Sequence, residues 1–250
     1  TIKNTSEAQF QTEFECEFLG SVDTLINAQK LKTMAIIDPK RSPDGLDVYE
    51  MPIMNHTYVT TVDVARGVNN DYSAFIVFDA TQAPYKIVAK YRNNDIKPIV
   101  FPNILKRIAD YYNKAYVLIE INDLGQQVAD AMQFELEYDN MMMVTQRGRA
   151  GQVLGGGFSG RGNQLGLRMT KGTKKIGTSN LKSLIEGDKL IIQDFEILSE
   201  LSTFISKGKS FEAENGAHDD LVMCLVIFSW CANQRYFKEL TNVDVRGQMF

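Results

Sequence analysis

Four carboxylates occupy positions in this chain that suit chemistry on a phosphodiester bond. Asp63 lies in the middle of one β-rich run, and Glu120 lies near the end of a second. Asp219 and Asp220 open a helix. A carboxylate in an apolar strand is costly to bury unless a cation or a hydrogen-bond donor compensates its charge. We therefore expect one divalent cation, or a pair, to collect carboxylates from both strands and from the helix start, an arrangement that suits two-metal hydrolysis.

The ligand types favour Mg²⁺ or Mn²⁺, which are hard ions that prefer carboxylate oxygens and water. Two such ions about 3.5–4 Å apart can activate water and stabilise the leaving oxygen. Only two histidines, His56 and His218, are present, which argues against a His-rich zinc site. The predicted catalytic and metal-binding residues are Asp63, Glu120 and Asp220.

Three further residues are candidates for supporting roles. Asp71 follows Asp63 across a turn, and it either points back toward Asp63 or caps that turn. Asp219 is the better candidate for the helix cap, which leaves Asp220 free to turn toward the sheet. His218 either orients a metal-bound water or a phosphate, or is only a polar residue at a helix start.

The elements that must position these residues can be predicted from periodicity. Short connections join the first three strands and indicate an antiparallel meander. A crossover helix before the fourth strand implies parallel pairing. The predicted strands and helix are Tyr58–Ala65, Tyr72–Asp79, Tyr85–Tyr91, the helix Phe101–Asn113, and the strand Ala115–Ile121.

The second half of the chain alternates helices with short strands, and a long apolar helix that must pack on the sheet comes last. The predicted elements are the helix Gly125–Leu136, the strand Met141–Thr145, the helix Thr178–Gly187, the strand Leu190–Gln193, and the helices Phe195–Ile205 and His218–Ala232. This order fits an α/β fold of the ribonuclease H-like type, a mixed five-stranded sheet flanked by helices. We expect an added hairpin or loop in the Gly-rich basic segment.

The distribution of charge favours a nucleic-acid partner although the net charge is −4. The segment 147–182 contains eight basic residues, no acidic residue and ten of the 18 glycines. Such a segment either follows a phosphate backbone or is a solvated loop. The predicted DNA-binding residues are Arg147, Arg149, Arg161, Arg168, Lys171, Lys174 and Lys175.

Composition bounds the remaining possibilities. The chain has 250 residues with 44% apolar and 23% charged content, typical of a globular protein, and no run long enough to span a bilayer. Three cysteines without metal-ligand spacing indicate a reducing, cytoplasmic setting. The segment at 208–210 resembles the end of a phosphate-binding loop, but Thr203 stands where the required glycine would be, so no ATP binding is expected. A turn-rich stretch at 38–45 predicts a linker segment over residues 1–52 and a main domain over 53–250.

The motifs jointly resemble the nuclease domain of the large terminase of T-even-type tailed bacteriophages. The matching segments are Thr61–Asp63, Asp71–Tyr72, Ile119–Glu120, Leu181–Ile192 and Gly216–Met223, with Phe14–Gly20 resembling the segment that follows that protein's ATPase domain. By position, the resemblance assigns Asp63, Glu120 and Asp220 to the metal-binding triad and Asp71 to a supporting acid.

The resemblance implies a DNA-packaging motor whose nuclease cuts concatemeric double-stranded DNA at initiation and at headful termination. The implied partners are an ATPase domain that precedes residues 1–52, the portal of the prohead and the small terminase subunit, with no membrane. The implied location is the cytoplasm of the infected host, with transient docking on the prohead. Two alternatives remain: a junction resolvase or transposase-like nuclease of the same fold, and a non-catalytic DNA-clamping module.

Overall fold

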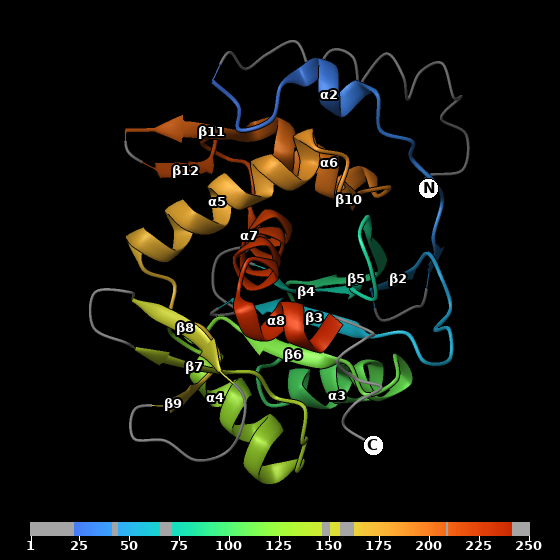
Figure 1. The fold of residues 1–250 in the computed structure, drawn as a ribbon, viewed down its shortest axis with the longest axis vertical. Coiled ribbons are helices and arrows are strands. Elements are labelled where there is room, and N and C mark those ends of the chain that lie inside the picture. The colour runs from blue at the N-terminus through green and yellow to red at the C-terminus, as the bar shows by residue number, and fades with distance from the viewer. Residues whose placement is uncertain are drawn as a thin grey trace.

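The computed structural model describes residues 23–41, 45–65, 72–146, 151–155, 163–208 and 210–241. A seven-stranded mixed sheet forms its centre, in the order β1-β2-β5-β4-β3-β6, with β10 paired to β5 (Figure 1). The strands are β1 (Lys40–Arg41), β2 (Leu46–Val48), β3 (Tyr58–Asp63), β4 (Ser73–Asp79), β5 (Tyr85–Asn93), β6 (Tyr116–Ile119) and β10 (Leu190–Ile191).

The predicted meander and the parallel fourth strand are confirmed. Strands β3, β4 and β5 pair antiparallel in chain order. Helix α3 (Phe101–Tyr111) then carries the chain across the sheet, and β6 pairs parallel to β3. All of β3 before Asp63 is buried, because helices cover both faces of the sheet.

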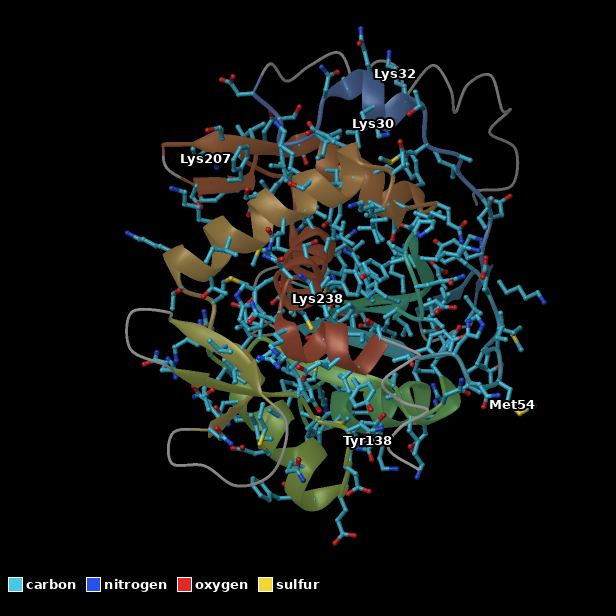
Figure 2. All side chains as sticks on the ribbon, in the orientation of Figure 1. Lys30, Lys32, Met54, Tyr138, Lys207 and Lys238 are labelled. Carbon is cyan, nitrogen blue, oxygen red and sulfur yellow. The ribbon has the colours of Figure 1, made fainter. Side chains whose placement is uncertain are left out.

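Two hydrophobic cores lie on the two faces of the sheet, and side chains fill both layers (Figure 2). One core lies under α3, α4 (Gly125–Asp130) and the π-helical turn Ala131–Glu135. The other lies under α2 (Ala28–Lys32), α5 (Lys171–Glu186), α6 (Phe195–Thr203), α7 (Asp220–Ala232) and α8 (Arg235–Thr241). None of the described helices is both long and apolar enough to cross a bilayer.

Helix α7 is the predicted apolar helix that packs on the sheet. Every residue from Leu221 to Ala232 is buried. The Thr61 hydroxyl of β3 donates a 2.8 Å hydrogen bond to the carbonyl of Cys224, which ties α7 to the strand that ends in Asp63.

Two small sheets lie outside the central one. The Gly-rich basic segment contributes β8 and β9, which pair antiparallel with β7 on either side in a three-stranded sheet of order β8-β7-β9, so the predicted hairpin is part of a larger sheet. The strands of this sheet are β7 (Met143–Gln146), β8 (Gln152–Gly155) and β9 (Asn163–Leu165). Strands β11 (Phe204–Lys207) and β12 (Ser210–Ala213) form a hairpin after α6, so the predicted helix Phe195–Ile205 ends earlier, at Thr203.

The mixed sheet flanked by helices is confirmed, and it contains seven strands in place of the predicted five. Three short strands join the predicted strands β3, β4, β5 and β6, and the predicted strand Met141–Thr145 lies in the separate small sheet as β7. Strands β1 and β2, from the predicted linker segment, join the sheet through the pairing of β2 with β5. Strand β10 pairs with the first residues of β5.

Helix α5 begins at Lys171, seven residues before the predicted start. The Thr170 hydroxyl caps it by accepting from the Thr173 N–H at 3.1 Å. Two of the ten glycines of the basic segment, Gly172 and Gly177, lie inside this helix. A Cβ at Gly177 would lie 2.6 Å from the carbonyl oxygen of Val226, so glycine allows α5 to lie close against α7.

Candidate metal centre

Asp63 and Glu120 come from neighbouring strand ends. Asp63 is the last residue of β3, and Glu120 directly follows β6. The parallel register pairs Val62 with Ile119, and the Glu120 N–H donates a 2.9 Å hydrogen bond to the Val62 carbonyl. The two predicted strand carboxylates therefore lie on neighbouring strands, at the carboxyl ends of β3 and β6.

The backbone on both sides of Glu120 is held by close contacts. The Leu167 N–H donates to the Ile119 carbonyl at 2.8 Å, and the Ile121 N–H donates to the Leu167 carbonyl at 2.9 Å. A Cβ at Gly125 would lie only 1.7 Å from the carbonyl oxygen of Glu120. A side chain larger than hydrogen at position 125 would therefore displace Glu120.

Asp220 is the first residue of α7, and the start of this helix lies near Asp63. A backbone hydrogen bond from Tyr72 holds its carboxylate. The Oδ2 atom lies 3.7 Å from Arg92 Nη2 and 3.8 Å from His218 Nδ1, yet it is buried and accepts no hydrogen bond from the described residues. This oxygen therefore retains an unused lone pair for a ligand.

The predicted capping role of Asp219 is wrong. Asp219 occupies the N-cap position of α7, but its side chain makes no capping hydrogen bond. The cap comes from Glu200 of α6, whose Oε2 accepts from the N–H groups of Leu221 at 2.9 Å and Val222 at 3.1 Å. The Asp219 carboxylate instead lies 3.9 Å from Lys174 Nζ.

Ionisation of the three predicted ligands is unfavourable in the metal-free chain. Burial, together with the charges of Glu120 and Asp220, raises the pKa of Asp63 well above its usual range. Burial raises the pKa of Glu120 to about 7, although Lys174 opposes the rise. Burial also raises the pKa of Asp220 to about 6 against the opposing charge of Arg92. A bound cation would offset the cost of ionising all three.

The donor set fits a hard divalent cation, since all three side chains offer carboxylate oxygens and Asp220 Oδ2 lacks a hydrogen bond. The described residues contain no group of three or more His, Cys, Asp and Glu side chains arranged to hold an ion as they stand. Ion binding would therefore draw the side chains of Asp63, Glu120 and Asp220 together from fixed backbone positions.

Of the two remaining supporting candidates, the structure describes His218 alone. His218 lies beside Asp220, and its ring stands edge-on to Tyr72 with ring centroids 5.1 Å apart. This places an imidazole at the margin of the carboxylate group. Asp71 lies outside the described residues.

The described members of the predicted DNA-binding set lie at and just before the first turns of α5, and one of them, Lys174, lies next to the carboxylates. Arg168, Lys171 and Lys175 are exposed. Lys174 is less exposed and lies between Asp219 and the Phe204 ring, with its Nζ 5.6 Å from the ring centroid. Arg147, Arg149 and Arg161 lie outside the described residues.

Sequence reasoning did not single out Glu200 or Arg92, although the helical pattern held a signal for Glu200. Ile197, Leu201 and Glu200 share the buried face of α6 at helical spacing. A carboxylate on such a face requires a partner inside the protein. Arg92 supplies that partner, with its Nη2 3.2 Å from Glu200 Oε1.

Comparison with known proteins agrees with this architecture. The family model for the terminase RNaseH-like domain matches residues 60–228. The large terminase nuclease of thermophilic phage G20c with bound magnesium superposes with a TM-score of 0.64 at 21% identity, covering 84% of this chain and 98% of that one. The same nuclease with bound cobalt gives a TM-score of 0.63 at 21% identity, with the same coverage.

The large terminase nuclease domain of Thermus phage P74-26 gives a TM-score of 0.57 at 20% identity, covering 79% of this chain and 90% of that one. At these identities the superpositions show a shared ribonuclease H-like fold. The family model spans more than half of the chain and includes Asp63, Glu120 and Asp220. This chain belongs to the terminase RNaseH-like domain family.

Proposed function

We propose that this chain is a metal-dependent endonuclease that cuts concatemeric double-stranded DNA during phage genome packaging, including the headful cut. The observation that carries the proposal is the electrostatic interaction of buried Asp63 with Glu120 and Asp220, each of which is in a setting that raises its pKa. Support also comes from the similar large terminase nucleases, which bind magnesium and cobalt.

In the proposed mechanism, Asp63, Glu120 and Asp220 hold two Mg²⁺ or Mn²⁺ ions. When bound, such ions supply an activated water and stabilise the leaving oxygen of an in-line displacement. The strand ends fix the backbones of Asp63 and Glu120, and α7 carries Asp220 toward them. His218 orients a water or a phosphate at the margin of the site, and Asp71 has a supporting acidic role.

The proposed DNA path follows the start of α5. Arg168, Lys171 and Lys175 are exposed at and just before the start of α5, and Arg147, Arg149 and Arg161 belong to the same basic stretch. Contacts to phosphates position a duplex without reading its sequence. Lys174 lies close enough to Asp219 to act on the metal site as well as on DNA.

The proposed setting is the packaging motor of a T-even-type phage. There, an ATPase domain precedes the segment 1–52, whose strands β1 and β2 are part of the nuclease sheet, and no ATP binds to this chain. The metal centre lies within 53–250. The proposed partners are the portal of the prohead and the small terminase subunit, in the cytoplasm of the infected host.

The test is nicking and linearisation of supercoiled plasmid by the purified chain in Mg²⁺, in Mn²⁺ and in chelator. The proposal predicts cleavage with either ion and none in chelator. DNA binding without cleavage in any divalent ion would favour a DNA-clamping module instead.

A further inference from the structure

Glu200 is a buried carboxylate that lies between the first turn of α7 and the guanidinium of Arg92. Its side chain is 6% exposed. Oε2 accepts from the N–H groups of Leu221 and Val222 in the first turn of α7, and Oε1 lies 3.2 Å from Arg92 Nη2. Oε2 is therefore occupied by the start of α7, whereas Oε1 accepts no hydrogen bond from the described residues and is held near Arg92 by charge.

Arg92 is shared between Glu200 and the metal centre. Its Nη2 also lies 3.7 Å from Asp220 Oδ2. Its guanidinium lies over the Tyr72 ring, 4.0 Å from the centroid, which restricts its movement. A guanidinium stays charged at any pH relevant to proteins, so Arg92 attracts both carboxylates permanently.

Helix α6, which carries Glu200, is fixed at its start by the same strand that carries Arg92. Lys90 of β5 is 1% exposed, with its Nζ 2.7 Å from Asp194 Oδ2 and 2.6 Å from Glu196 Oε2. Asp194 caps α6 by accepting from the Ile197 N–H at 2.7 Å. Strand β5 thus anchors the start of α6 through Lys90 and holds Glu200 through Arg92.

We propose that Glu200 is a positioning residue that keeps Asp220 available to divalent metal. Its carboxylate caps the first turn of α7, and its negative charge holds Arg92 at 3.2 Å while Asp220 stays at 3.7 Å. Without that charge, Arg92 closes on Asp220, and this ion pair competes with the metal. The inference rests on the proposed function, because it assumes that Asp220 is a metal ligand.

The test compares the metal affinity of variants by calorimetric titration with Mn²⁺, alongside plasmid cleavage. Glu200→Gln keeps the volume and an acceptor for the α7 N–H groups but removes the charge. We expect its Mn²⁺ affinity to fall about tenfold or more, because Arg92 then closes from 3.7 Å onto Asp220 and the cation has to displace this tighter ion pair. Saturating Mn²⁺ should restore most of its cleavage rate.

The double variant Glu200→Gln/Arg92→Gln separates positioning from support of the fold. It removes both charges, so Asp220 has no competing guanidinium. We therefore expect its Mn²⁺ affinity to lie within about threefold of wild type, which is about 0.7 kcal/mol. Glu239→Gln is the matched control. Glu239 also pairs with an arginine, Arg235, but on the exposed surface of α8, and its affinity should equal that of wild type.

Each result decides between positioning and fold support. A lower melting temperature in Glu200→Gln with unchanged Mn²⁺ affinity would assign Glu200 to the fold alone and overturn the inference. A double variant that binds Mn²⁺ as weakly as Glu200→Gln would also overturn it. If Glu200→Gln does not fold, the double variant is compared with wild type alone, and a lower Mn²⁺ affinity in the double variant would overturn the inference. A wild-type chain that binds no Mn²⁺ would instead refute the proposed function, and the inference with it.

Discussion

The N–H of Glu120 donates a 2.9 Å hydrogen bond to the carbonyl of Val62. This bond continues the parallel pairing of β6 with β3 one residue beyond the last paired strand residue. It sets Glu120 beside Asp63, because Asp63 directly follows Val62. Two carboxylates with raised pKa values are thus brought together by backbone pairing, which does not depend on either side chain.

Removal of any one metal-ligating charge should abolish cleavage. We expect Asp63→Asn, Glu120→Gln and Asp220→Asn each to lower the rate of plasmid cleavage by about 100-fold or more, because lost charge stabilisation of several kcal/mol gives such factors. Asp188→Asn is the control. Asp188 is exposed and follows the C-terminal end of α5, whereas the N-terminal end of α5 lies near the carboxylates. Full activity in any of the three variants would remove that residue from the metal centre.

The metal-free chain should lose stability as pH rises. Glu120 and Asp220 ionise near pH 4 in an unfolded chain, but their pKa values in the folded chain are about 7 and about 6. Between these values the folded chain binds more protons, so their contribution to stability is full below about pH 4 and lost as pH rises through about 7.

This pH dependence can be measured by calorimetry in chelator at pH 5 and pH 8. The wild-type chain should lose more free energy of unfolding over this range than the Glu120→Gln/Asp220→Asn double variant, by on the order of 1–3 kcal/mol. An equal loss in the two proteins would contradict the raised pKa values. Saturating Mn²⁺ should reduce the difference, because a ligand that binds only the folded state stabilises it.

Truncation of Glu200 and truncation of Asp219 should have different effects on stability. Glu200→Ala removes the α7 cap and the buried ion pair with Arg92, so we expect a loss of roughly 2–4 kcal/mol in the free energy of unfolding. Asp219→Ala removes no capping hydrogen bond and should cost no more than about 0.5 kcal/mol. Denaturant unfolding measures both. A larger loss in Asp219→Ala would restore Asp219 as the cap.

The exposed lysines at the start of α5 should act on DNA affinity alone. We expect Lys171→Ala/Lys175→Ala to weaken DNA binding for all sequences and to lower the salt slope by about one unit per lost phosphate contact. Mn²⁺ affinity should stay unchanged in this variant. Lys174→Ala should alter Mn²⁺ affinity as well, because Lys174 Nζ lies 3.9 Å from Asp219. Unchanged affinity and salt slope in the double variant would place the DNA path elsewhere.

Local pattern was sufficient to predict the part of the fold that holds the strand carboxylates. The short turns between β3, β4 and β5 allow only antiparallel neighbours, and helix α3 requires a parallel β6. These two constraints place Asp63 and Glu120 together. The start of α5 was missed because Gly172 and Gly177 resemble loop residues until the contact of Gly177 with Val226 is known.

Partnerships between distant residues could not be predicted from one sequence. Asp219 has the residue type and position of an N-cap, but Glu200, about twenty residues earlier in the chain, takes that role through packing of α6 against α7. In the same way, Lys174 was assigned to the DNA path by charge alone. Its place beside Asp219 depends on α5 beginning at Lys171.

The central claim, that Asp63, Glu120 and Asp220 together hold divalent metal, is tested most directly by anomalous diffraction from crystals soaked in Mn²⁺. The account predicts a peak about 2.2 Å from carboxylate oxygens of Asp63 and of Glu120 or Asp220, and a second peak about 3.5–4 Å from the first. Mn²⁺ peaks only at other acidic residues, with none within bonding distance of Asp63, would contradict it.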